Sequence, residues 1–223
     1  SSFVANKLGL DTITLLGGSE SGGAAHLTSV DASTRDYFSR LPGFDTLRFV
    51  LCKTAVLVEG PSDELVFQRA YRDSHDGKLP IQNGIDVISI GTSFQRYLPI
   101  ACEIGLRVVV ITDNDDNPET LDERYSSYLS AENIEVCYES KAHGVPEGGN
   151  PDLRWNTLEA TLLRENGIDK LDQVLGVNFN DWSSLLKWME SNKTDAAFRL
   201  FSSDTPIAYP EYIKKALAFV DLS

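Results

Sequence analysis

The chain has 223 residues, of which 42% are hydrophobic and 24% charged, an ordinary composition for a globular protein. Its 20 Lys and Arg residues against 33 Asp and Glu give a net charge of −13, which argues against broad, nonspecific nucleic-acid binding. No apolar run approaches the ~20 residues that cross a bilayer, so we expect neither a membrane-spanning protein nor a membrane partner. A nucleic-acid enzyme stays possible, because metal ions can cancel charge where a phosphate arrives.

The three cysteines, Cys52, Cys102 and Cys137, each lie in an apolar segment. Their odd number and scattered spacing fit neither a disulfide framework nor a zinc site. We expect buried small side chains in a reducing environment, and therefore a cytoplasmic protein. No signal peptide is evident, and the chain opens with Ser1-Ser2 without a Met, so we expect a fragment or a processed product.

The N-terminal part begins with an expected strand over 12–16, followed by the polar, glycine-rich stretch 17–23. That stretch resembles a phosphate-binding loop only superficially, because the Lys-Ser/Thr end of such a loop is missing. The pattern then predicts a helix over 31–52 that Pro42-Gly43 breaks into two pieces.

Strand and helix signals alternate from residue 53 to residue 140. Short β-branched runs bounded by Gly, Pro or Asp predict strands at 54–59, 85–90, 107–112 and 134–138. Helices are predicted between them at 62–73, 93–104 and 118–131. Repeated β-α-β units of this length indicate a parallel sheet in an α/β fold.

The pattern changes after residue 140. A Gly- and Pro-rich loop over 143–151 is followed by helical signals at 156–165, 182–191, 195–201 and 211–220. We interpret this part as a helical addition beside the sheet, with Trp155, Trp182 and Trp188 packing it.

The first acidic motif ends the strand at 54–59. Glu59 has no structural reason to terminate a buried strand, whereas Gly60 allows a ligand to approach the backbone closely. Ser62 is a plausible N-cap, so Asp63 and Glu64 enter the first turn of the next helix. For Glu64 we favour a simple interaction with the helix dipole.

The second acidic motif follows the strand at 107–112. Asp113 and Asp115 alternate along the strand end and can address one ion or two adjacent ions, while Asp116 either joins them or lies in solvent. A calcium-binding EF loop starting at Asp113 would need Gly and Glu where Pro118 and Arg124 stand. A haloacid-dehalogenase-type phosphatase would have Thr or Val at position 117, and a receiver domain is not built around an early Glu.

Carboxylates at the carboxyl ends of parallel strands point into the crevice where α/β sheets bind ligands. Several carboxylates that converge there repel one another unless a cation neutralises them. A hard divalent ion with a preference for oxygen ligands, such as Mg²⁺, is the natural partner. Hydroxyls near the strand ends, those of Ser89 and Thr112, could support such ligands or bound water.

Glu at the end of one strand and Asp-x-Asp at the end of a later one resembles the Toprim fold of topoisomerases, primases and several nucleases. Residues 57–64 and 112–115, taken with 156–159 and 192–197, resemble the C-terminal catalytic region of the OLD-family (overcoming lysogenization defect) nucleases. The resemblance covers most of the chain from about residue 45 onward. It implies an α/β, Toprim-like parallel sheet flanked by helices, with an added helical subdomain.

The resemblance also implies a set of site residues and partners. It assigns Glu59, Asp63, Asp113, Asp115 and Glu159 as metal ligands, although Glu159 taken alone would be read as an exposed helix residue. Glu59, Asp113 and Lys193 are then the catalytic residues, with Lys214 and Lys215 as rival lysines. The implied cofactor is two Mg²⁺ or Mn²⁺ ions, with Ca²⁺ as a non-reactive substitute.

The implied activity is metal-dependent DNA endonuclease cleavage by a two-metal mechanism. In that family the Toprim region follows an ABC-type ATPase domain. No Walker motif occurs here, so this chain would be the nuclease half, with a homodimer possible. The implied organisation is a linker and helical segment over 1–45, a Toprim core over 46–140, and a part over 141–223 that completes the site and forms the helical subdomain.

Two other functions stay open from the residues alone. A noncatalytic Toprim-like module would recruit DNA or protein partners, although it would not need Glu59, Asp113 and Asp115 together. A topoisomerase or primase core would need a tyrosine-bearing or polymerising partner that the motifs do not indicate. The histidines, His26, His75 and His143, show no metal-ligand spacing and are expected in surface loops.

Overall fold

The computed structural model describes residues 14–16, 24–26, 31–40, 48–114, 116–140 and 154–222, and a four-stranded parallel sheet lies at its centre. Its strands are β3 (Thr54–Val58), β4 (Ile85–Ser89), β5 (Arg107–Ile111) and β6 (Ile134–Cys137), in the spatial order β4-β3-β5-β6. Each begins and ends within one residue of its predicted bounds. The protein is therefore an α/β fold with the predicted parallel sheet.

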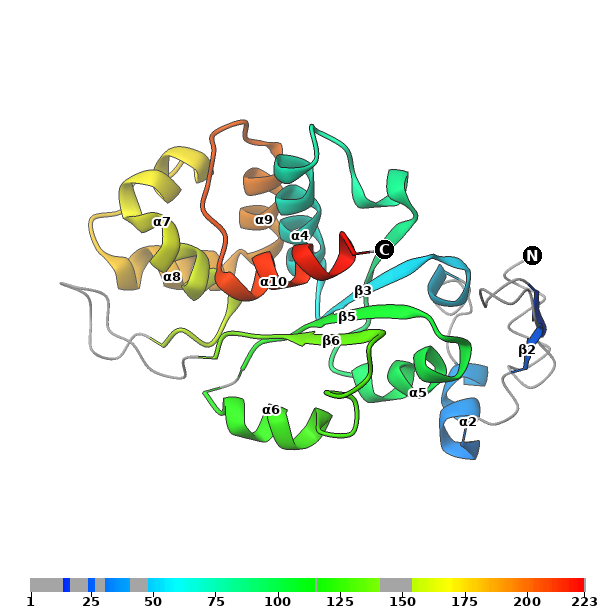
Figure 1. Cartoon of the computed structure of the whole chain (residues 1–223). Helices are drawn as coiled ribbons and strands as arrows, with labels where there is room; N and C mark the ends of the chain where they lie inside the picture. The colour runs from blue at the N-terminus through cyan, green and yellow to red at the C-terminus, as the bar shows by residue number, and fades with distance from the viewer. Residues whose placement is uncertain are drawn as a thin grey trace.

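Helices cover both faces of the sheet (Figure 1). Helices α5 (Phe94–Ile104) and α6 (Pro118–Tyr125) lie on one face, and α4 (Pro61–Ser74) and α10 (Glu211–Val220) lie on the other. Successive side chains of a strand point to opposite faces, and β3 is buried along its whole length as a result. Its Val56 and Val58 belong to one apolar core, and its Ala55 and Leu57 belong to the other.

The C-terminal helices share a core with the sheet. Helices α7 (Leu158–Leu175), α8 (Trp182–Ser191) and α9 (Lys193–Ser202) pack beside α4, and α10 lies across β5 and β6. One continuous apolar cluster joins Val109 of β5 to Leu163 of α7 and Leu217 of α10. The three tryptophans pack this region as expected, with Trp155 only 2% exposed. The domain boundaries at 45/46 and 140/141 stay predictions.

The segment before the sheet holds two short strands and a helix. Strand β1 (Thr14–Leu16) falls inside the predicted 12–16 and pairs antiparallel with β2 (Ala24–His26), which was not predicted. The Ala-Ala-His sequence has weak strand propensity, so its pairing partner decides its conformation. His26 is therefore in a strand and not in a loop. Helix α2 (Ala32–Arg40) packs against α5, with the Phe38 and Tyr97 rings 4.8 Å apart.

Two helices end more than two residues away from their predicted ends. Helix α6 ends at Tyr125 rather than at residue 131, because the chain continues in single turns such as Tyr128 N–H to Tyr125 C=O. Helix α7 runs to Leu175 rather than to residue 165, because helical structure resumes after a kink at Gly167. The short 3₁₀ helix η3 (Pro80–Asn83) precedes β4. None of the helices in the described ranges is long and apolar enough to span a membrane.

The expected burial of the cysteines is correct only in part: Cys102 is exposed on α5, whereas Cys137 is buried as expected and Cys52 is half-buried. His75 lies in the turn after α4 as the C-cap of that helix, and its ring stacks on Tyr71. Its Nε2 lies 2.8 Å from a carboxylate oxygen of Asp221. His143 and the loop over 143–151 lie outside the described residues, as does the stretch 17–23.

Candidate functional site

The two acidic motifs meet at the carboxyl edge of the sheet, between its two central strands. The chain leaves β3 towards β4 on one side and returns to β5 on the other. This reversal of direction opens a crevice outside the strand ends, which is the usual ligand position in an open α/β sheet. Glu59 directly follows β3, and Asp113 follows β5 after one intervening residue. Both are placed at the crevice by the ends of buried strands.

Glu59 is held across the gap between the two strands. Its Oε1 accepts a hydrogen bond of 2.5 Å from the Thr112 hydroxyl and one of 3.0 Å from the Asp113 N–H. Thr112 therefore supports an acidic residue, as its position suggested. Ser89 lies further out and donates to Glu64 Oε2 at 2.9 Å, so Glu64 does more than complement the helix dipole.

Asp63 lies in the first turn of α4. Its carboxylate accepts the Gly60 N–H at 2.8 Å and so closes the turn that begins the helix, with Pro61 at the first helical position. Burial raises the pKa of Asp63 to about 6, and the charges of Glu159 and Glu59 add to this shift, although the Gly60 hydrogen bond opposes it. Asp63 thus lies in a low-dielectric environment with other carboxylates.

Asp113 joins the sheet to the C-terminal helices. Its Oδ1 accepts the Leu158 N–H at 3.1 Å, at the N-terminus of α7. Burial raises the pKa of Asp113 to about 8, and Asp63, Glu59 and Glu159 raise it further than Lys193 lowers it. The Leu158 N–H, the first of α7, is therefore directed at the acidic edge of the sheet.

Glu159 is buried in the first turn of α7, although the sequence alone indicated an exposed helix residue. It is 5% exposed, and the turn is fixed by the Thr157 side chain, which accepts the Ala160 N–H at 3.3 Å. Its Oε2 accepts no hydrogen bond from the described residues, and its recorded partner is the Lys193 ammonium at 3.4 Å. A buried carboxylate oxygen with a single cationic neighbour has capacity for a further cation.

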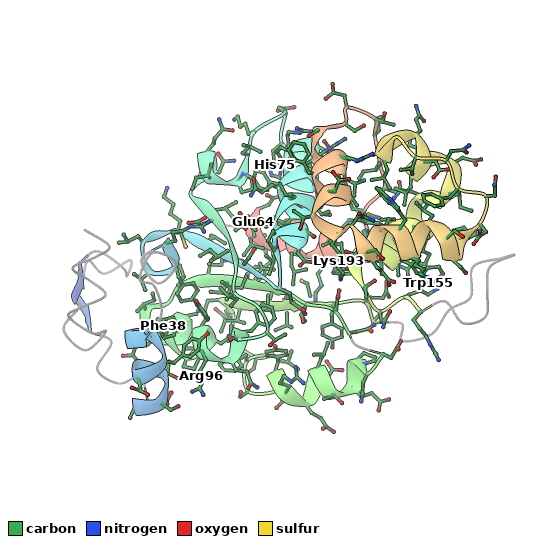
Figure 2. The ribbon with its side chains drawn as sticks, turned by 180° about the vertical axis from the view of Figure 1, so that it is seen from behind. Phe38, Glu64, His75, Arg96, Trp155 and Lys193 are labelled. Carbon is green, nitrogen blue, oxygen red and sulfur yellow. The ribbon has the colours of Figure 1, made fainter. Side chains whose placement is uncertain are left out.

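Lys193 lies at the start of α9 (Figure 2), and its ammonium is 3.4 Å from Glu159 Oε2. Burial on its own would lower the pKa of Lys193, but Glu159, Asp113 and Asp63 outweigh it and raise the pKa above its ordinary value. The two rival lysines, both on α10, form ion pairs away from this cluster. Lys214 contacts Glu211 at 3.5 Å, and Lys215 contacts Glu135 at 2.5 Å.

Asn114 was missed as a candidate residue from sequence, although it stands between the two aspartates. It is 1% exposed, and its amide donates to the Glu139 C=O at 2.6 Å and accepts the Asp116 N–H at 3.0 Å. Its own N–H donates to the Asn156 C=O at 3.3 Å. Its partners Glu139 and Asn156 lie 25 and 42 residues away in the chain, so no local sequence signal could have revealed this structural role.

The remaining acidic residues of the second motif are less informative. Asp115 lies outside the described residues, so its assignment as a metal ligand stays a prediction. Asp116 has a positive φ of 62° and is partly buried, with a carboxylate oxygen that has no hydrogen-bond partner among the described groups. Asp116 is therefore not fully in solvent, and no hydrogen bond joins its side chain to Glu59, Asp63, Asp113 or Glu159.

The carboxylates of Glu59, Asp63, Asp113 and Glu159 have the chemistry to bind a divalent cation, but they are too far apart to bind one as they stand. Within the described ranges, no three His, Cys, Asp or Glu side chains are grouped closely enough to hold a metal ion. The donor set is nonetheless all oxygen, two of its members have raised pKa values, and a buried Glu159 oxygen lacks a hydrogen bond. A hard cation would relieve each of these costs, so the residues fit Mg²⁺ or a similar ion.

Comparison with known proteins agrees with the fold. Residues 50–115 match the family model described as the TOPRIM domain of overcoming lysogenization defect protein-like proteins. The C-terminal region of the Xanthomonas campestris pv. campestris OLD protein superimposes with a TM-score of 0.53 at 19% identity, over 78% of this chain and 94% of that one. The C-terminal region of the Burkholderia pseudomallei OLD protein gives 0.53 at 19% identity, over 76% and 97%. No curated protein matches the chain in sequence.

Proposed function

We propose that this chain, which carries an OLD-like Toprim domain, is a metal-dependent DNA endonuclease module, a hydrolase of phosphodiester bonds. The observation that supports it best is the meeting of Glu59, Asp63, Asp113 and Glu159, from three separate segments, beside the Lys193 ammonium. Carboxylates buried together are unfavourable in a merely structural role, because each raises the free energy of its charged neighbours.

The proposed metal ligands are Glu59, Asp63, Asp113, Asp115 and Glu159. Toprim domains in general bind divalent metal ions, and the all-oxygen donor set suits two Mg²⁺ or Mn²⁺ ions, with Ca²⁺ as a non-reactive substitute. When bound, such a pair lowers the pKa of the attacking water and stabilises the leaving oxygen.

The chain's own residues supply orientation and charge. Thr112 and the Asp113 N–H hold the Glu59 carboxylate in one direction, so little reorganisation is needed when a substrate arrives. The carboxylates raise the pKa of Lys193 and outweigh its burial, so it keeps the charge that a lysine carries at neutral pH and can face the negative charge that grows on the phosphate during attack. Glu59, Asp113 and Lys193 are therefore the proposed catalytic residues.

The proposed partners follow from the net charge and from the family. With a net charge of −13, the chain cannot attract DNA through its whole surface, so contact would be concentrated at the cations of the site. We further propose that an ATPase domain of the same polypeptide precedes this module in the cytoplasm, and that the assembly is a homodimer.

Cleavage of supercoiled plasmid tests the proposal directly. We expect nicked or linear product with Mg²⁺ or Mn²⁺, none with EDTA or Ca²⁺ alone, and a loss of at least about 100-fold in Asp113→Ala. Glu211→Ala is the matched control, because its side chain is 88% exposed and it should cleave like the unmodified chain. Absence of cleavage with every metal, from folded protein, would reject the nuclease and favour a recruitment module.

A further inference from the structure

A buried arginine, Arg69, joins the distal half of α4 to the end of α9. It is 2% exposed, and its Nε donates to both carboxylate oxygens of Asp73, at 2.7 and 2.8 Å. Its Nη1 donates to the Leu200 C=O at 2.5 Å and also to the Ser203 C=O. Its Nη2 donates to the Thr205 C=O at 3.0 Å. One guanidinium thus satisfies three carbonyls at and beyond the last turn of α9.

Helices α4 and α9 lie side by side and run in the same direction (Figure 2). Near the start of α9 the Lys193 ammonium lies 3.4 Å from Glu159 Oε2, and near its end the Leu200 C=O accepts a hydrogen bond from Arg69. From Lys193 to Leu200 is seven residues. At 1.5 Å per residue this span is about 10 Å, so Arg69 holds α9 about two turns along the same rigid helix from Lys193.

From this geometry we propose that Arg69 is a positioning residue that fixes the axial register of α9 against α4 and thereby holds the Lys193 ammonium at Glu159. Its importance for cleavage rests on the proposed function, whereas its effect on the place of Lys193 does not. A helix packed only by apolar side chains can shift along its neighbour by a fraction of a turn at modest cost. Three directed hydrogen bonds from one planar group do not allow that shift.

The surroundings of Arg69 make it suited to this role. The Tyr209 hydroxyl donates to Asp73 at 2.6 Å, so the carboxylate that orients the guanidinium is itself held. The carbonyl end of α9 carries the negative end of the helix dipole, which a buried cation stabilises. A lysine at this place could keep the charge but could not donate to Asp73 and three carbonyls together.

The test measures where Lys193 lies, independently of any metal. The side chains of Lys193, Lys214 and Lys215 are 48, 53 and 56% exposed, so the two lysines on α10 are internal references for reaction with an amine-acylating reagent. The variants are Arg69→Lys and the double variant Arg69→Met with Asp73→Asn, which leaves no unpaired charge. Arg107→Met is the matched control, because Arg107 donates to the Phe219 C=O near the end of α10, at 3.2 Å.

We expect peptide mass spectrometry to show that the reagent acylates Lys193 about three to ten times faster in both Arg69 variants than in the unmodified chain, relative to Lys214 and Lys215. The reason is that the amine is no longer held beside the Glu159 carboxylate. Arg107→Met should leave the Lys193 ratio unchanged. An unchanged ratio in the Arg69 variants, or an equal rise at all three lysines, would overturn the proposal.

Plasmid cleavage by the same variants separates this inference from the proposed function. A displaced Lys193 with cleavage reduced roughly tenfold or more supports both. A displaced Lys193 with unchanged cleavage supports Arg69 as the positioning residue and rejects the catalytic role of Lys193.

Discussion

At the scale of single residues, three of the four described carboxylates of the site are held by a hydrogen bond from the backbone or from another segment. Glu59 is held by Thr112 across the sheet, Asp63 by Gly60 within its own turn, and Asp113 by the Leu158 N–H of α7. Each hydrogen bond favours the charged form, yet the pKa values of Asp63 and Asp113 are raised. Burial and mutual repulsion are therefore stronger than the local hydrogen bonds, and the site is unfavourable until a cation neutralises it.

The first prediction is that Asp113→Asn stabilises the metal-free protein. The amide oxygen can still accept the Leu158 N–H, while the buried carboxyl group and its repulsion are removed. We expect urea unfolding at pH 7 to give a free energy of unfolding higher by roughly 1–3 kcal/mol. Asp169→Asn, at an exposed position of α7, should change it by less than about 0.5 kcal/mol. A less stable Asp113→Asn would show that the carboxylate is needed for the fold.

A site residue could be predicted from the sequence where its position in the fold is set by residues close to it in the chain. Glu59, Asp63 and Asp113 could be placed because each follows a strong strand or helix signal within a few residues. The burial of Glu159 could not, because it depends on the docking of α7 against the end of β5, through the bond between Asp113 and Leu158. The buried role of Asn114 could not either, since its partners are 25 and 42 residues away in the chain.

At the scale of elements, α7 owes its shape to one glycine. Gly167 has φ 73° and ψ 171° inside the helix, a conformation that is essentially restricted to glycine. The kink lets the first part of α7 carry Glu159 to the site, while the second part packs on α8 and α9. The predicted end at residue 165 was thus a correct sign of interruption, but helical structure resumes because Leu171, Val174 and Leu175 are buried.

We predict that Gly167→Ala lowers the free energy of unfolding by about 3 kcal/mol or more, entirely through backbone strain. No atom lies within 4 Å of the place that the new Cβ would take, so steric contact is not the cause. Gly105→Ala is the control: Gly105 also has open space, but its φ of 64° and ψ of 25° are accessible to other residues at a cost of only about 1–2 kcal/mol. Thermal or urea unfolding of both variants decides, and equal losses would show that the kink is not specially strained.

The remaining elements show where local patterns suffice. Helices α8 and α10 begin and end at their predicted residues, because each has a regular apolar stripe and a clear boundary, Asp181 as N-cap in one and Pro210 in the other. Strand β2 was not predicted, because its three residues have weak strand propensity and depend on their pairing partner. The end of α6 was mispredicted, because the serine-containing segment after Tyr125 forms single turns instead of continuing the helix. Long-range packing decides such segments, and one sequence does not reveal it.

At the scale of the whole molecule, the sheet and the C-terminal helices share one apolar core. The charged groups of the site lie where the carboxyl edge of the sheet meets the first turns of α4 and α7. The stability of the protein is therefore coupled to the ionisation of the site. The pKa of Asp63 is raised to about 6 and that of Asp113 to about 8, from an ordinary value of 3.8. Between pH 4 and these values the folded chain holds more protons than the unfolded chain, so its stability must fall as the pH rises.

The last prediction follows from this coupling. Urea unfolding of the metal-free chain, monitored by circular dichroism at pH values from 5 to 8, should show stability falling more steeply than in the double variant Asp63→Asn with Asp113→Asn, by roughly 5 kcal/mol over the range. The comparison isolates these two groups, because the self-repulsion of a chain with net charge −13 also grows with pH in both proteins. Parallel pH profiles would show that neither carboxyl group is perturbed.

Metal should oppose this trend, and only in the unmodified chain. At a fixed concentration equal to 100 times its dissociation constant at pH 8, Mg²⁺ would add about 2.7 kcal/mol to the free energy of unfolding at pH 8 and less at pH 5, because the ligands must lose their protons to bind it. The double variant should gain little at either pH, since two of the carboxylates are replaced by amides. A gain that is independent of pH, or equal in both proteins, would place the metal away from Asp63 and Asp113. The acidic edge of the sheet would then be a source of instability without the compensation that the proposed nuclease chemistry requires.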